Sequence, residues 1–151
     1  MDRERDLFIN DILGEIQREM EKAFGKAAYE RWKAPLFMGR LEEPDGCGRL
    51  MGICGDSMEI FLKFEGDRVK EARYLSDGCG SSAVCASFAA EIAVGKSPRE
   101  ILQVRGDDII EKMERIPEQD RHLAELAAAT LKTAVRDYEA RRGIEGKGKG
   151  R

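Results

Sequence analysis

The sequence DGCGSS, residues 77–82, stands where a strand-like pattern ends and a helix-like pattern begins. Glycine on each side of Cys79 allows positive φ angles and lets another group approach the backbone closely. The serines that follow are typical of a helix N-terminus, where the positive end of the helix dipole favours a thiolate over a thiol. We therefore predict that Cys79 is a thiol suited to metal or sulfur chemistry, placed just ahead of a helix.

Three short strands are predicted before this stretch, because apolar residues alternate with polar ones and turn residues separate the runs. Their ranges are 49–53, 58–64 and 69–75. A tight turn at 65–67 makes the last two strands an antiparallel hairpin. The hairpin places Asp56 and Asp77 at the same end, so we expect Cys54 and Cys79 to meet there.

Helices are predicted on both sides of the strands from apolar spacing and from capping residues. Their ranges are 6–24, 26–34, 83–94, 107–116 and 119–141, with a short helix from Pro98. Because strands and helices are segregated along the chain, we predict an α+β fold in which a small three-stranded antiparallel sheet carries the C-terminal helices.

The length of 151 residues suits one domain, which we place at 1–142 with an extended N-terminal helix. The Gly- and Lys-rich tail, 143–151, is predicted to be disordered. The apolar stripe of the helix at 6–24 favours packing on the domain. A second interpretation, an arm that docks a partner, is left open.

The composition excludes several classes of partner. Net charge is −3, with 42% hydrophobic and 36% charged residues, which gives no reason to expect nucleic acid or an anionic membrane as partner. No apolar run reaches the roughly 18 residues of a membrane span. The charged N-terminus lacks a secretory apolar segment, so we expect a cytoplasmic protein whose four cysteines serve metal or sulfur chemistry rather than disulfides.

Four side chains form a candidate ligand set. Cys54 and Asp56 lie two residues apart on an extended backbone and so point to the same side. Cys79 joins them at the hairpin end, and His122, the only histidine, begins the last predicted helix. Two thiolates, a carboxylate and an imidazole suit tetrahedral zinc or iron–sulfur chemistry. A Cys79–His122 nucleophile and base pair is a weaker hypothesis, since no motif of a substrate pocket accompanies it.

Taken together, three motifs resemble one known family. GICGDSM at 52–58, GCGS at 78–81 and His122 ahead of Leu126-Ala127 are similar in order and spacing to the U-type iron–sulfur cluster assembly scaffolds. These are IscU, SufU and the N-terminal domain of NifU, and the resemblance runs from Tyr29 to Tyr138. It implies an α+β fold with a three-stranded sheet.

The resemblance also implies a function and a site. The scaffolds are not enzymes: they receive sulfur from a cysteine desulfurase, assemble a labile [2Fe–2S] cluster and deliver it to apo iron–sulfur proteins. By resemblance, the residues that bind the metal or cluster are Cys54, Asp56, Cys79 and His122. In the family, the aspartate is associated with keeping the cluster labile. This is physically reasonable, because a hard carboxylate is a poor permanent ligand for iron–sulfide chemistry.

The chain departs from the family pattern in two places. Leu123 stands where family members carry a third cysteine, which leaves open a zinc-binding sulfur acceptor or desulfurase adapter that builds no cluster. Cys47 and Cys85 are potential replacements; for Cys85 a core position is favoured, and for Cys47 neither interpretation is. Residues 116–120 retain only the proline of the family's chaperone-docking segment, so a dedicated heat-shock-type chaperone is not expected.

Overall fold

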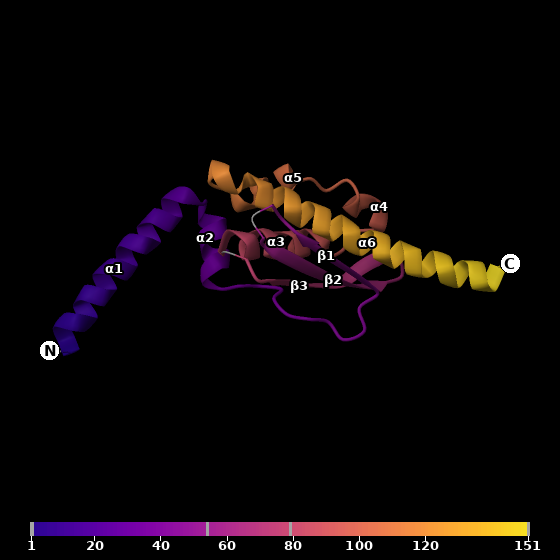
Figure 1. Cartoon of the computed structure of the whole chain (residues 1–151), viewed down its shortest axis with the longest axis horizontal. Helices are drawn as coiled ribbons and strands as arrows, with labels where there is room; N and C mark the ends of the chain where they lie inside the picture. The colour runs from indigo at the N-terminus through magenta and orange to yellow at the C-terminus, as the bar shows by residue number, and fades with distance from the viewer. Residues whose placement is uncertain (1, 54, 79, 151) are drawn as a thin grey trace.

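The computed structural model describes residues 2–53, 55–78 and 80–150, without the side chains of Asp2 and 144–150. Figure 1 shows helices at both ends of the chain and a small sheet between them. The helices are α1 (Asp2–Ala23), α2 (Lys26–Lys33), α3 (Gly80–Ala93), α4 (Pro98–Ile101), α5 (Gly106–Met113), the 3-10 turn η1 (Glu118–Asp120) and α6 (Arg121–Gly150). The predicted α+β class is confirmed.

The sheet has three antiparallel strands in the order β1–β2–β3. They are β1 (Gly46–Met51), β2 (Ser57–Glu65) and β3 (Arg68–Ser76). The register aligns Met58 with Ser76 across the hairpin, as the predicted turn requires. β1 begins three residues earlier than predicted, because Gly46 and Gly48 belong to the strand and not to a preceding loop.

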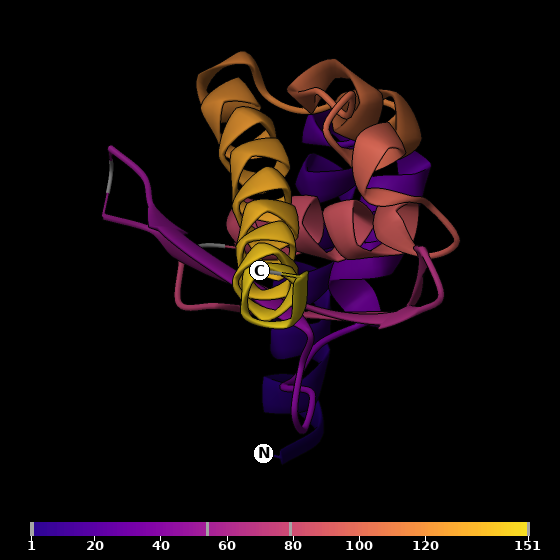
Figure 2. The same ribbon diagram turned by 90° about the vertical axis from the view of Figure 1, so that its right-hand side faces the viewer.

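One face of the sheet carries the helices. α6 packs along β1 and α3 packs on β3, while α5 contacts both of these helices. Figure 2 shows the arrangement along the axis of α6, with that helix lying over the strands. The largest fully buried side chains are Tyr74, Met58, Ile60, Leu62, Ile101, Ile109, Met113, Leu123, Leu131 and Val135. They come from the sheet and from three helices, so the molecule has one hydrophobic core.

Helix α6 approaches β1 at backbone distance. A Cβ atom on Gly48 would lie 2.5 Å from the carbonyl oxygen of Thr130 and 2.6 Å from the nitrogen of Ala134. No larger residue fits there without moving the helix. The N–H of Cys47 donates to Oδ2 of Asp137 at 2.9 Å, which gives this strand edge a hydrogen-bond acceptor from the same helix.

The prediction that the first helix packs along the domain is wrong. Only the end of α1 reaches the core, through Met20, Ala23 and the following Phe24. The chain turns at Gly25, whose N–H donates to the carbonyl oxygen of Arg115 at 3.1 Å. Beyond this anchor α1 leaves the body of the molecule, as Figure 1 shows, and its large apolar side chains stay exposed.

Two remaining expectations concern the whole chain. Among the described residues, no helix combines the length and the apolar character needed to cross a membrane. Helix α6 reaches Gly150 and so includes most of the tail 143–151. The domain boundary at 142 and the disorder of the tail in solution stay predictions.

Candidate functional site

The β1–β2 loop, with described residues 52–53 and 55–56, and the β3–α3 loop, with described residues 77–78, leave the sheet at the same end. Three hydrogen bonds between Ser57, the first residue of β2, and Asp77 connect them. The backbone N–H and the hydroxyl of Ser57 both donate to Oδ1 of Asp77, at 3.0 and 2.6 Å. The N–H of Asp77 also donates to the carbonyl oxygen of Ser57 at 3.3 Å. This Ser57–Asp77 clasp fixes the two loops relative to each other.

The clasp affects the charge of Asp77. The hydrogen bonds from Ser57 hold the pKa of the Asp77 carboxyl below its usual value of 3.8, and the nearby Arg49 contributes in the same direction. The carboxylate is therefore ionised throughout the neutral range. A negative charge accordingly stands two residues before the cysteine of the second loop.

Asp56 lies directly against the second loop. A Cβ atom on Gly78 would stand 2.8 Å from both Cγ and Oδ1 of Asp56 and 2.7 Å from the hydroxyl oxygen of Ser82. Only glycine therefore leaves room for the carboxylate at this point. The Ser82 hydroxyl is buried and has no hydrogen-bond partner in the part of the chain that is described. The register of the hairpin thus places Asp56 and Asp77 at the same end, as predicted.

The start of α3 is held by two further contacts that the sequence did not predict. The indole nitrogen of Trp32 would lie 2.9 Å from a Cβ atom on Gly80, so the ring rests on this glycine. The Ser81 hydroxyl donates to Oδ2 of Asp120 at 3.0 Å, which connects α3 to the turn that precedes α6. No sequence signal pairs these residues, because each contact joins elements far apart in the chain.

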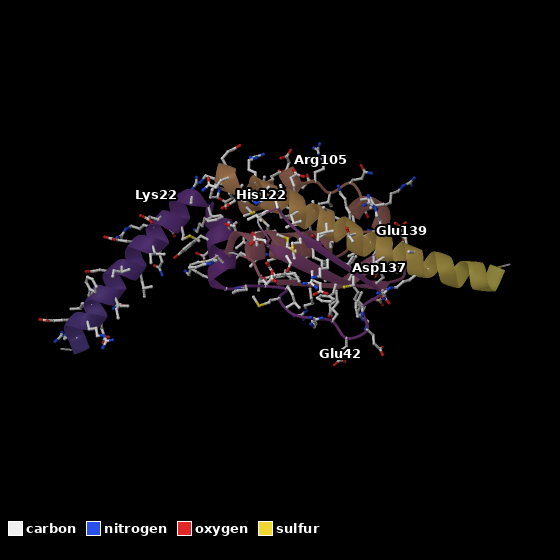
Figure 3. All side chains as sticks on the ribbon, viewed as in Figure 1. Lys22, Glu42, Arg105, His122, Asp137 and Glu139 are labelled. Atoms are coloured by element: carbon white, nitrogen blue, oxygen red, sulfur yellow. The ribbon has the colours of Figure 1, made fainter. Side chains whose placement is uncertain are left out.

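His122 occupies the beginning of α6, as predicted, and is half-buried; Figure 3 labels it there. Nearby residues of its segment reach the start of α3 and the first loop. Asp120 contacts Ser81, and a methyl carbon of Leu126 lies 3.1 Å from the position of a Cβ on Gly52. The segment that carries the imidazole thus borders the same end of the sheet. Leu123, in the position of the missing cysteine, is only 1% exposed and belongs to the core.

Two of the four predicted ligands, Cys54 and Cys79, lie outside the described residues. Across 2–53, 55–78 and 80–150, no three His, Cys, Asp or Glu side chains are grouped so that they could hold a metal ion. The structure brings Asp56 and the segment of His122 to the loops that contain the two cysteines. The complete ligand set of Cys54, Asp56, Cys79 and His122 stays a prediction.

Of the other two cysteines, Cys47 lies away from this end of the sheet. Cys47 lies near the start of the edge strand β1, opposite Phe61 of β2 and about 13 Å along β1 from Met51 by strand geometry. Burial, and next the carboxylate of Glu59, whose Oε2 accepts from the thiol at 3.7 Å, raise the pKa of Cys47 above 9.0. Cys47 therefore belongs to a paired strand, and its thiol stays protonated at neutral pH.

Cys85 is a core residue, as the favoured interpretation had it. Its side chain is fully buried in α3, and its sulfur lies 3.7 Å from the sulfur of Met113 in α5. Whether Cys47 or Cys85 takes the role of the missing third cysteine stays open, because Cys54 and Cys79 lie outside the described residues.

A three-stranded sheet with helices on one face, and with two cysteine-containing loops and an imidazole-bearing helix start at one end, defines a class of protein. It is a small α+β domain in which Asp56 lies against the segment before α3, and the segment that leads into α6 contacts the start of α3. A family model described as the NifU-like N terminal domain matches residues 23–145, and the chain belongs to this family.

Relatives in the family extend along most of the chain. The chain is 30% identical over 121 residues to the iron-sulfur cluster assembly scaffold protein IscU 1 of Archaeoglobus fulgidus, a match covering 80% of this chain and 79% of the relative. It is 29% identical over 126 residues to the scaffold protein IscU of Haemophilus influenzae, covering 80% of this chain and 99% of the relative.

Solved structures agree on the fold. A nitrogen-fixing NifU-like protein (N-terminal) from Brucella abortus superposes with a TM-score of 0.64 at 16% identity, covering 80% of this chain and 97% of that one. A putative scaffold protein for the SUF system from Fervidobacterium islandicum gives a TM-score of 0.63 at 16% identity, covering 76% and 98%. At this identity the likeness concerns the fold alone.

Proposed function

We propose that this protein is an iron–sulfur cluster assembly scaffold, which binds iron and sulfide transiently and delivers the cluster to apo-proteins. The observation that carries the proposal is the position of the Asp56 carboxylate against Gly78, next to Cys79 in the chain. This position supports a shared site for the two cysteine loops. Membership of the NifU-like family and the names of the relatives support the same function.

The ligands in this proposal are Cys54, Asp56, Cys79 and His122, and the cargo is a [2Fe–2S] cluster. Thiolates suit iron in such clusters, and a histidine can replace a thiolate. Leu123, which stands where the family pattern has a third cysteine, is buried in the core and supplies no ligand. Asp56 then weakens the hold on the cluster, because a carboxylate is a hard ligand. A site of this composition suits temporary binding.

The proposed partners are a cysteine desulfurase, which supplies sulfur, and apo iron–sulfur proteins, which receive the cluster; the protein itself is not an enzyme. Exposed apolar side chains at the first loop support docking of proteins there. Ile53 is 96% exposed and Met51 is 67% exposed, an uncommon placement for residues without a partner. We place this activity in the reducing cytoplasm, where free thiols persist.

Anaerobic reconstitution with iron and sulfide tests the proposal. The wild type should gain iron and acid-labile sulfide together with thiolate-to-iron absorption in the visible range. Cys54→Ser and Cys79→Ser should each lose this absorption. Cys47→Ser is the matched control, because its sulfur lies away from the loops, and it should bind as the wild type does. Retention of cluster by both loop variants would overturn the assignment.

The same preparations test the alternative of a zinc-binding sulfur acceptor or desulfurase adapter. Two thiolates, a carboxylate and an imidazole also suit tetrahedral zinc. Stoichiometric zinc in protein isolated without air, combined with no sulfide-dependent colour after reconstitution, would favour the adapter. Iron and sulfide in equal amounts would favour the scaffold.

A further inference from the structure

Helix α1 is the one long element that the family match leaves out, since the match begins at residue 23. It projects from the body of the molecule in Figure 1. Its exposed large apolar side chains are Leu7, Phe8, Ile9, Ile12, Leu13 and Ile16. The scaffold function proposed above gives these side chains no role.

The helix is attached only near its C-terminal end. There the Arg115 guanidinium donates to the carbonyl oxygens of Glu21 and Phe24 at 2.8 and 3.1 Å. Helical stability in proteins comes mainly from packing of an apolar face, and exposed apolar patches of this kind mark interaction sites. We therefore expect another molecule to bind the apolar stripe between Phe8 and Ile16.

The charged residues along the stripe indicate which partner binds it. Arg5 precedes Ile12 by seven residues and Glu19 follows it by seven, close to two helical turns in each direction. Both charged residues are exposed and fall on the side of the helix that carries Ile12. Phe8 and Ile16 stand four residues before and after Ile12. The stripe is thus arranged symmetrically about Ile12, with opposite charges at its two ends.

We propose that α1 pairs with α1 of a second copy of this chain, antiparallel, with the two-fold axis at Ile12. Arg5 of each copy then meets Glu19 of the other, and Phe8 packs against Ile16. The parallel arrangement brings Arg5 against Arg5 and Glu19 against Glu19, so the charges select the antiparallel one. The pairing is isologous, as expected for a two-fold dimer.

The length and the charge of α1 are consistent with pairing to a second copy of the same helix. Its 22 residues span about 33 Å, long enough for a continuous two-helix seam that leaves the two bodies at opposite ends. Acidic side chains outnumber basic ones in α1 by seven to four. Helices that lie on anionic membranes carry the reverse excess, so a membrane surface is a poorer cover.

Analytical ultracentrifugation of the full-length protein over a range of concentrations tests the pairing. The wild type should form dimers at micromolar concentration. Ile12→Glu should raise the dimer dissociation constant at least a hundredfold, because it places two carboxylates at the two-fold axis. Arg5→Glu and Glu19→Arg should each raise it about two- to thirtyfold, because each substitution removes both of the symmetric exposed ion pairs. The double variant Arg5→Glu/Glu19→Arg should return it to the wild-type value.

The double variant Arg5→Glu/Glu19→Arg is the strongest test of the antiparallel pairing. Rescue requires that Arg5 faces Glu19 across two chains, and no effect within one helix or in a parallel pair produces it. Arg18→Glu is the matched control, because the Arg18 guanidinium lies over Gly14, away from the stripe, and the reversal should leave the dimer unchanged. Circular dichroism confirms that each variant is folded.

Three outcomes would overturn the proposal. They are a monomeric wild type at every concentration, dimers that Ile12→Glu leaves intact, and a double variant no better than its parents. Binding of a monomeric wild type to phosphatidylserine vesicles would assign the stripe to a membrane instead. Iron and sulfide binding should be equal in the wild type and in Ile12→Glu, so failure of the pairing is distinguishable from failure of the scaffold function.

Discussion

At Gly78 a single methyl group decides where a carboxylate can lie. In Gly78→Ala the new Cβ would stand 2.8 Å from Asp56 Cγ, so the carboxylate must move. We expect at least a threefold loss of iron and sulfide retained after anaerobic reconstitution and desalting, with a stability loss of about 1–3 kcal/mol from overpacking. Gly143→Ala adds the same methyl group with nothing within 4 Å and serves as the control. Equal retention by Gly78→Ala would show that the position of Asp56 is irrelevant to binding.

The Ser57–Asp77 clasp makes stability depend on pH in a defined direction. Because the pKa of Asp77 is lowered in the folded state, its contribution is complete above the ordinary value of 3.8 and is lost as pH falls through the folded pKa. Asp77→Asn should therefore be less stable than the wild type at pH 7, and the gap should narrow below pH 3.8. Urea unfolding at several pH values measures this.

The control for the clasp is Glu71→Gln, which removes a carboxylate from the exposed face of the same strand. It should leave the free energy of unfolding within about 0.5 kcal/mol of the wild type, as surface substitutions usually do. A difference between Asp77→Asn and the wild type that stayed constant down to pH 2 would argue against the titration of Asp77.

At this scale the sequence predicted the site only in part. The hairpin turn at 65–67 fixes the register and so brings Asp56 level with Gly78. The contacts of Trp32 with Gly80 and of Ser81 with Asp120 join elements whose relative positions depend on packing, for which local patterns carry no information. The role of Cys47 was ambiguous from the sequence, because glycines on both sides of a cysteine are typical of a loop. In the structure these glycines belong to β1 and allow α6 to pack closely on the strand.

Close packing of α6 on β1 is the contact between elements that allows least change. Gly48→Ala would drive a Cβ into the backbone of Thr130 and Ala134, so relaxation requires movement of the helix. We expect a loss of about 3 kcal/mol in the free energy of unfolding, at the upper end for overpacked cores. Denaturant titration followed by far-UV circular dichroism measures the loss.

Gly14→Ala is the control for Gly48→Ala, because a Cβ atom on Gly14 in α1 would lie 3.7 Å from the flexible end of the Arg18 side chain and near no backbone of another element. Helix propensity then favours alanine by up to about 1 kcal/mol. If Gly48→Ala proved as stable as the wild type, α6 would not rest on the strand as closely as the structure has it.

Most elements were predictable from local patterns. The three strands and the helices appear within a few residues of their expected ranges, except that α6 continues nine residues beyond its expected end at 141. The direction of α1 was not predictable. Its stripe is apolar enough to suit a core, but the turn at Gly25 carries the helix away from the core.

For the whole molecule, the pairing of α1 predicts concentration-dependent hydrogen exchange. Amides of residues 5–16 should exchange quickly at nanomolar concentration and become protected as dimers form. Amides of the buried helix α3 should exchange slowly and equally at every concentration. Mass spectrometry of deuterium uptake measures both. Strong protection of α1 at the lowest concentration would mean that another part of the same chain covers it.

The sheet also separates two ends of the molecule that serve different purposes. Ser57 and the clasp stand at one end of β2, and the Glu65–Gly66–Asp67 turn stands at the other, about 26 Å away over nine residues. Gly66 has a positive φ of 66° with nothing within 4 Å of a Cβ position, so the turn is exposed. A chemical tether attached at Asp67 would immobilise single molecules with the proposed cluster loops facing solution. Arrival and departure of iron and sulfur could then be followed one molecule at a time.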